Sequence, residues 1–280
     1  MSSVTRRSVH RCFEGTVVFC EHASREIGGM MRFAVFWPRQ ATDRPVPALL
    51  YLAGLTCTEE TFMTKAGALG AAARLGLALV APDTSPRDRR YPGDDDSWDF
   101  GQGAGFYIDA TEAPWRAGYR MYSYVANELP EVIENEFPVD PDRWGVFGHS
   151  MGGHGALVVG LRNPGRFQSI SAFAPICAPM SCPWGNKAFS NYLGSDRQAW
   201  RAYDAVELIR GGMRAGEILV DQGLADQFLA EQLNPHKLEK ACAEAGQALT
   251  LRRHSGYDHG YFFIQTFIED HLAHHRKALA

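Results

Sequence analysis

Apolar segments of strand length alternate with longer segments of helical periodicity over most of the chain. Short, nearly continuous apolar runs predict buried strands, whereas apolar residues spaced three and four apart predict helices. The predicted strands are residues 48–53, 77–81, 143–147, 169–173, 217–221 and 249–254. The predicted helices are residues 62–74, 119–137, 151–163, 204–209, 235–245 and 260–277. This alternation predicts an α/β protein with a mostly parallel central sheet and helices on both faces.

The N-terminal part and one internal segment depart from this alternation. Residues 15–22 and 31–37 predict an antiparallel hairpin that turns near Gly28. Residues 83–118 show no period, and loops of this length in compact domains commonly carry function. Aromatic residues of this segment either wall a pocket or fix the loop on the sheet, and the sequence leaves both open: Trp98, Phe100, Phe106 and Tyr107. Without a repeat or linker, one domain over residues 1–280 is expected.

Composition and charge narrow the classes of function. The chain has 28 Lys and Arg against 32 Asp and Glu, so it lacks the basic surplus of a nucleic-acid-binding protein. Its apolar runs are far shorter than the roughly 20 residues of a membrane span, and no apolar stretch of a secretion signal follows Arg6 and Arg7. The six cysteines show no zinc pattern. We therefore expect a cytoplasmic protein with reduced thiols, no metal ion, and no nucleic-acid or membrane partner.

A catalytic serine is predicted from the sequence Gly148-His149-Ser150-Met151-Gly152, which matches the pattern Gly-x-Ser-x-Gly. Alone, the pattern also fits a glycine-rich turn without catalysis. Here it follows a predicted strand and opens a predicted helix, which is the setting of the nucleophile elbow in the α/β-hydrolase fold. The positions two before and two after the serine nearly touch in that turn, so glycine removes a clash at both. We therefore predict an α/β-hydrolase fold with Ser150 as the nucleophile.

The base must follow the nucleophile, because the triad of this fold runs serine, acidic residue, histidine along the chain. His259 lies in a glycine-flanked loop between the last predicted strand and the last helix, where the fold places its base. His254, at the end of a predicted strand, is a weaker rival. Three histidines of the final helix are expected to face solvent: His271, His274 and His275.

The acid must orient the imidazole and stabilise its protonated form. Two aspartates follow the same predicted strand: Asp221 ends it, and Asp226 lies on the loop beyond. A loop carboxylate reaches the neighbouring loop of His259 more readily, so the pattern modestly favours Asp226. An N-cap of the short helix that follows is the alternative role for this residue.

Two backbone amides are predicted to form an oxyanion hole. One belongs to Met151, directly after the nucleophile, and the other to the loop after the first parallel strand. That loop places Leu55 in the donor position, and Gly54 lets the backbone approach closely. Each donor of this kind contributes roughly 3–4 kcal/mol of transition-state stabilisation.

Longer blocks of sequence carry a more specific signal. They are GLTCTE at 54–59, WDFG at 98–101, GAGFY at 103–107, YRMYSY at 119–124, GHSMGGHGAL at 148–157, AFAPIC at 172–177, CPWG at 182–185, DQG at 221–223, DQF at 226–228 and GYDH at 256–259. Together these blocks resemble the S-formylglutathione hydrolases, also known as the esterase D family. The resemblance implies a triad of Ser150, Asp226 and His259 that hydrolyses S-formylglutathione to glutathione and formate. It further implies a cytoplasmic homodimer that uses no metal or cofactor.

This substrate suits the predicted chemistry, because a thiol with a pKa of about 8.5 leaves as a thiolate with little protonation. Formyl is the smallest acyl group, so bulky side chains are expected near the nucleophile. The predicted pocket residues are Cys57, Trp98, Phe100, Trp184 and Tyr257, and the candidates for binding the glutathione carboxylates are Lys65, Arg87 and Arg90. The main alternative is a broad short-chain carboxylesterase with the same triad. An acyltransferase and an inactive, partner-binding scaffold are further alternatives.

Overall fold

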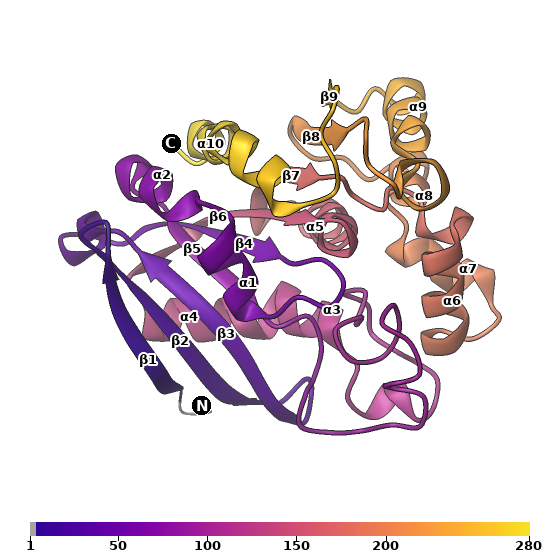
Figure 1. The fold of residues 1–280 in the computed structure, drawn as a ribbon, viewed down its shortest axis with the longest axis horizontal. Coiled ribbons are helices and arrows are strands. Elements are labelled where there is room, and N and C mark those ends of the chain that lie inside the picture. The colour runs from indigo at the N-terminus through magenta and orange to yellow at the C-terminus, as the bar shows by residue number, and fades with distance from the viewer. Residues whose placement is uncertain (1–3) are drawn as a thin grey trace.

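The computed structural model describes residues 4–280, whose strands form one nine-stranded sheet (Figure 1). The strands are β1 (Thr5–Cys12), β2 (Gly15–Ser24), β3 (Gly29–Trp37), β4 (Val46–Leu52), β5 (Ala78–Pro82), β6 (Val139–His149), β7 (Phe167–Phe173), β8 (Ile218–Gly223) and β9 (Leu249–His254). Their order across the sheet is β1-β2-β3-β5-β4-β6-β7-β8-β9. The pairs among β1, β2, β3 and β5 are antiparallel, whereas every pair from β5 to β9 is parallel. The predicted mostly parallel sheet with an antiparallel N-terminal hairpin is confirmed.

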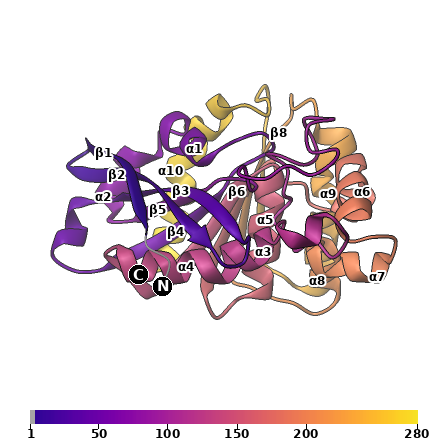
Figure 2. The same cartoon turned by 90° about the horizontal axis from the view of Figure 1, so that it is seen from below.

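Helices cover both faces of this sheet. They are α1 (Glu59–Lys65), α2 (Ala68–Leu75), α3 (Met121–Ser123), α4 (Leu129–Glu136), α5 (Met151–Arg162), α6 (Pro183–Tyr192), α7 (Arg197–Trp200), α8 (Ala205–Arg210), α9 (Pro235–Ala245) and α10 (Tyr261–Ala278). Helices α1, α2 and α10 lie on one face and α4 and α5 on the other (Figures 1 and 2). The buried apolar residues of both layers form one continuous cluster around the sheet.

Several elements differ from the predicted ones. Strand β1 was not predicted, because its side chains are mostly polar and exposed at the sheet edge and show no apolar alternation. The helix predicted over 62–74 is two helices, since Gly67 between them has a left-handed φ of 66°. The helix predicted over 119–137 contains a π-helical turn at Tyr124–Glu128 between α3 and α4. Helices α6 and α7 were not predicted.

The histidines of α10 were wrongly predicted to face solvent. His271 and His275 are fully buried against β7. His271 Nδ1 lies 2.8 Å from the Ser171 hydroxyl, and His275 Nδ1 lies 2.6 Å from the Ser169 hydroxyl. His274 is half-buried, with Nε2 3.2 Å from a backbone carbonyl of the same strand. Their burial is tolerated because serines of β7 supply hydrogen-bond partners in the interior.

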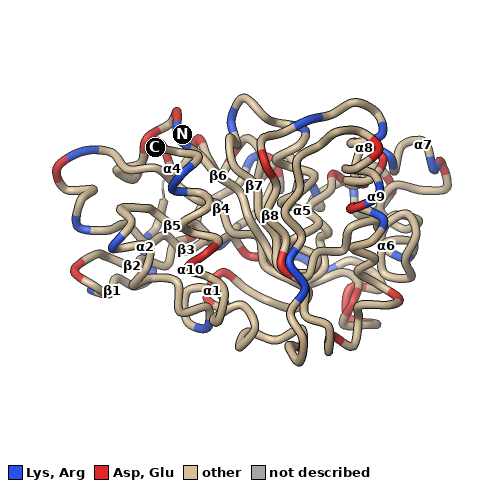
Figure 3. The backbone as a smooth tube through the Cα atoms, turned by 90° about the horizontal axis from the view of Figure 1, so that it is seen from above, with Lys and Arg blue, Asp and Glu red and all other residues tan. Residues whose placement is uncertain are grey.

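Charged residues of both signs are spread along the chain (Figure 3), apart from the run of three aspartates at 94–96. Among residues 4–280, none of the helices combines the length and the apolar character that a bilayer crossing requires.

Candidate active site

The predicted nucleophile lies on a strained turn between β6 and α5. Ser150 has φ 58° and ψ −119°, a conformation that non-glycine residues rarely adopt, and its N–H donates to the Phe173 carbonyl at 3.0 Å. A Cβ atom at Gly148 would overlap the Gly152 carbonyl, and one at Gly152 would overlap the Leu52 carbonyl. Both glycines are therefore sterically required, which is the geometry of a nucleophile elbow.

The structure places the predicted base and one of the two candidate acids in direct contact. His259, in the loop between β9 and α10, has its Nδ1 2.6 Å from Oδ2 of Asp226. The other carboxylate oxygen of Asp226 accepts the N–H of Phe228 at 2.8 Å, so this residue both caps the following turn and orients the imidazole. Asp221 instead forms an ion pair with Arg252 on β9. A carboxylate only accepts hydrogen bonds, so His259 carries its proton on Nδ1 and leaves the Nε2 lone pair available.

The two predicted oxyanion donors belong to backbone segments that lie next to Ser150. Met151 is the first residue of α5, so its amide is one of the unpaired N–H groups at a helix N-terminus. The loop after β4 passes so near the nucleophile that a Cβ atom at Gly54 would lie 3.2 Å from Cβ of Ser150. Leu55 follows on this loop and lines the same cavity as Ser150.

A cavity of about 130 Å³ lies at the nucleophile. Its lining contains Ser150, His259, Leu55 and three of the predicted pocket residues, namely Cys57, Trp98 and Trp184. Gly54, His149, Phe228 and Tyr261 complete the lining. Sequence reasoning missed the last three, although Phe228 and Tyr261 each lie two residues beyond a predicted triad member, and His149 directly precedes Ser150.

Two predicted pocket residues lie elsewhere. Phe100 stacks on Tyr192 of α6, with ring centroids 4.7 Å apart. Tyr257 packs against Phe267 of α10 at 5.0 Å. Each of these rings packs against another aromatic side chain, and neither borders the cavity.

The aromatic side of the cavity is one packed group. Trp184 meets Trp98 edge to face at 5.6 Å and Phe228 at 4.7 Å between ring centroids. Phe228 in turn lies 5.0 Å from the His259 ring. Aromatic pairs at such distances stabilise one another beyond their simple burial, so a bound group has to fit beside these rings.

Burial changes the titration of two groups that line the cavity. Burial, together with the neighbouring His259, lowers the pKa of His149 well below its usual value, so this ring stays neutral 4.4 Å from the His259 ring. A neutral neighbour leaves His259 free to take a proton without repulsion from a second cation. Burial also raises the pKa of the Cys57 thiol, which therefore stays protonated near neutral pH.

Two of the three cations predicted to bind carboxylates are engaged within the chain. Arg87 binds the Asp83 carboxylate, and Arg90 forms an ion pair with Asp95. The charge of Lys65 acts on the Cys57 thiol of the cavity, where it opposes the rise in pKa, so Lys65 stays a candidate. Among residues 4–280, no three His, Cys, Asp or Glu side chains are grouped closely enough to hold a metal ion.

Known proteins of the same sequence family share this architecture. A family model described as "Putative esterase" matches residues 24–274. The S-formylglutathione hydrolase of Mus musculus is 54% identical over 274 residues, which cover 97% of each chain, and that of Rattus norvegicus is 53% identical over 275 residues. The solved structure of an S-formylglutathione hydrolase from Agrobacterium tumefaciens is 48% identical, covers 99% of this chain and 100% of its own, and superposes with a TM-score of 0.97. The chain therefore belongs to this esterase family and groups with its S-formylglutathione hydrolases.

Proposed function

We propose that this chain is a serine hydrolase that converts S-formylglutathione to glutathione and formate. The observation that carries the proposal is the 2.6 Å contact between His259 Nδ1 and Asp226 Oδ2, at a cavity that Ser150 shares with His259. Relatives that bear the name S-formylglutathione hydrolase at 54% and 53% identity support the choice of substrate.

In the acylation step, Ser150 Oγ attacks the formyl carbon while His259 Nε2 takes the hydroxyl proton. The carbonyl electron pair moves onto oxygen, and the amides of Leu55 and Met151 donate to that oxyanion. Asp226 stabilises the imidazolium that has formed, without itself taking the proton. The neutral His149 ring next to His259 adds no opposing charge at this stage.

Collapse of the oxyanion breaks the carbon–sulfur bond and leaves a formyl-serine ester. Glutathione departs as a thiolate, which His259 protonates on its way out. Water then occupies the vacated place, gives its proton to His259 and attacks the ester carbonyl. The second oxyanion collapses, Ser150 Oγ recovers its proton from His259, and the formic acid produced gives its own proton to the solvent and leaves as formate.

The size of the cavity supports a small acyl group. Its volume is about 130 Å³, and Trp184, Phe228 and Tyr261 border it together with the backbone around Gly54. Longer acyl chains would have to displace packed aromatic rings, which core-like packing resists. Formyl needs no such displacement.

The test is steady-state hydrolysis of S-formylglutathione, S-acetylglutathione and p-nitrophenyl acetate by wild type and Ser150→Ala. We expect kcat/KM to be highest for the formyl thioester by several orders of magnitude, and Ser150→Ala to abolish turnover of all three. Equal kcat/KM values for thioesters and the simple ester would instead identify a broad short-chain carboxylesterase with the same triad. Turnover by Ser150→Ala would refute the assignment of the nucleophile.

The organisation of the protein is part of the proposal. We infer a single domain, since one sheet and one buried apolar cluster include the described chain from end to end. We further propose a cytoplasmic homodimer with no nucleic-acid or membrane partner, as the sequence resemblance implies. Light scattering coupled to size-exclusion chromatography tests the dimer, since a mass near 31 kDa would mean a monomer.

A further inference from the structure

The backbone turn Gly54–Cys57, which we name the oxyanion turn, carries the Leu55 amide. The Cys57 N–H donates to the Gly54 carbonyl at 3.3 Å and closes the turn. Thr56 within it has a left-handed φ of 67°. A β-branched residue disfavours that conformation, at a cost on the order of 1–3 kcal/mol, and such strain persists only where the surroundings hold the backbone.

Segment 83–118 supplies the groups that hold the oxyanion turn. Directly before the turn, the Tyr107 hydroxyl donates to the Ala53 carbonyl at 2.9 Å. Within the turn, the Thr56 N–H donates to the Gly103 carbonyl at 2.9 Å. The turn is thus fixed before and after Leu55 by a segment that is far from it in the sequence.

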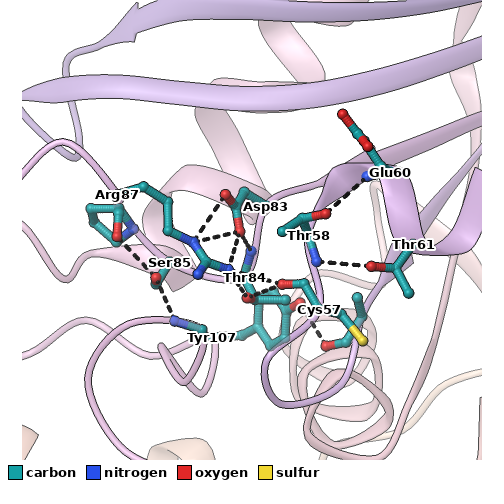
Figure 4. Close-up of polar contacts among 12 residues, drawn as sticks. Cys57, Thr58, Glu60, Thr61, Asp83, Thr84, Ser85, Arg87 and Tyr107 are labelled. Atoms are coloured by element: carbon teal, nitrogen blue, oxygen red, sulfur yellow. Dashed lines mark hydrogen bonds and ion pairs between the residues drawn. The ribbon is translucent and has the colours of Figure 1, made fainter. Parts of the chain in front are cut away.

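The last carbonyl of the turn accepts two side-chain donors at once (Figure 4). The Thr84 hydroxyl donates to the Cys57 carbonyl at 2.7 Å, and Arg87 Nη2 donates to the same oxygen at 3.1 Å. The Asp83 carboxylate orients Arg87 by accepting from Nε at 3.2 Å and from Nη2 at 2.9 Å. Asp83 and Thr84 are buried, so water does not readily replace these contacts.

We propose that Thr84 and Arg87 are positioning residues for the oxyanion hole: they hold the Cys57 carbonyl and thereby aim the Leu55 amide at the transition state. The inference rests on the proposed role of Leu55 as an oxyanion donor. It also explains why Arg87, a candidate for substrate carboxylates by charge alone, turns inward to Asp83 and the backbone. A guanidinium suits this position, since its fork satisfies a carboxylate and a carbonyl together.

The expected effect is on the transition state rather than on substrate binding. Loss of a whole oxyanion donor costs about 10²–10³ in kcat, so a misaimed donor should cost about 10-fold to 100-fold. We expect KM to change little, because neither Thr84 nor Arg87 lines the cavity at Ser150 and Arg87 is already bound to Asp83.

The experiment compares Thr84→Val with Thr84→Ser and wild type. Valine matches threonine in shape but has no hydroxyl, whereas serine keeps the donor. Four quantities are measured for the full chain. They are kcat and KM with S-formylglutathione and with p-nitrophenyl acetate, Ki for unreactive S-methylglutathione, and Ki for methylthio-trifluoropropanone. This ketone adds to Ser150 as a hemiketal with a negative oxygen, so its affinity reports the oxyanion hole.

We expect Thr84→Val to lower kcat by about 10-fold to 100-fold and to raise Ki for the ketone by a similar factor. KM and Ki for S-methylglutathione should stay unchanged. Thr84→Ser should restore both. Ser24→Ala is the matched control. It removes a buried hydroxyl of β2 that donates to Glu128 at 2.6 Å, and neither residue lines the cavity, so the variant should lose stability but keep its kcat. Arg87→Lys keeps the positive charge but loses the two-pronged guanidinium. Its kcat and its Ki for the ketone should lie between those of wild type and those of Thr84→Val.

Wild-type kcat and ketone affinity in Thr84→Val would overturn the proposal, as would a Thr84→Ser variant that is impaired to the same degree. If Thr84→Val does not fold, Arg87→Lys decides: an unchanged kcat and ketone Ki contradict the proposal. Failure of the proposed substrate is a separate result. In that case wild type does not hydrolyse S-formylglutathione, while p-nitrophenyl acetate and the ketone still test the oxyanion turn.

Discussion

Acyl-chain selectivity should depend on Trp184. This side chain projects from the first turn of α6 into the cavity lining and packs between Trp98 and Phe228, with ring centroids 5.6 and 4.7 Å away. Its backbone N–H donates to Gln232, a contact that alanine keeps. The variant Trp184→Ala therefore removes the indole from the cavity wall while the start of α6 stays anchored. We expect the variant to accept longer acyl groups that wild type rejects.

The magnitude follows from the area that a longer chain buries. S-butyrylglutathione has two more methylene groups than S-acetylglutathione, and each buried methylene contributes about 0.8 kcal/mol, or about 1.6 kcal/mol together. Once the indole is gone, the butyryl-to-acetyl ratio of kcat/KM should rise by about 15-fold over wild type, since about 1.36 kcal/mol corresponds to tenfold. Hydrolysis of the formyl thioester should fall, because the smaller group is held less firmly against the oxyanion donors.

The assay is kcat/KM for the formyl, acetyl and butyryl thioesters, with Trp200→Ala as the control. Trp200 is also a buried tryptophan, but it lies in α7, binds the Gly194 carbonyl through its indole N–H and does not line the cavity. Its variant should lose stability without a change in acyl preference. An unchanged butyryl-to-acetyl ratio in Trp184→Ala, or an equal change in Trp200→Ala, would refute the reasoning.

Three further predictions follow from the site. Asp226→Asn should lower kcat by about 10³–10⁴-fold with little effect on KM, because the amide no longer enforces the required His259 tautomer; a loss under tenfold in steady-state assays would contradict this. Since burial raises the pKa of Cys57, iodoacetamide should inactivate the enzyme slowly at neutral pH and faster as pH rises, and Cys57→Ser should remove this inactivation; an equally sensitive variant would exclude Cys57 as the target. Burial lowers the pKa of His154 from 6.5 to about 4, so the unfolded chain binds one more proton in that window and the free energy of unfolding falls as pH drops from 6.5 towards 4. Urea titrations should find a smaller pH slope for His154→Gln than for wild type, and equal slopes would contradict the assignment.

The nucleophile and its glycines were predictable because their chemistry is local. A strand, a tight turn and a helix follow one another within residues 139–162, and steric overlap in the turn leaves no choice but glycine at 148 and 152. The fold class was predictable for a related reason. The spacing of apolar residues in each segment indicates whether the segment is a strand buried on both faces or a helix buried on one face. The positions of Asp226 and His259 then follow from strand ends, since loops that leave the same edge of a parallel sheet lie together.

Side-chain directions could not be predicted in the same way. Phe100 and Trp98 are aromatic residues of one loop, yet only Trp98 borders the cavity, because Phe100 finds a stacking partner in Tyr192. His271 and His275 looked like polar surface residues of a helix. Their partners are serines of β7, about 100 residues earlier in the chain, and no local pattern records such a pairing. Burial of a polar group depends on where its partner lies, which is a property of the tertiary structure.

The absence of a period in residues 83–118 has a physical cause. A repeating apolar pattern arises when a segment packs one face against a layer. This segment instead contacts the oxyanion turn through single groups of Thr84 and Gly103, and Ala53 just before the turn through the Tyr107 hydroxyl. Gly103 has a left-handed φ of 77°, and a Cβ atom there would lie only 3.0 Å from Cα of Thr56, so backbone conformation and close approach together favour glycine. Contacts of this kind depend on single distances and not on a repeating pattern. In the sequence they are visible only as individual glycines, aromatic residues and hydroxyl-bearing residues. A long aperiodic loop that follows a strand of an α/β sheet can therefore position the backbone of a neighbouring loop, in addition to covering the site.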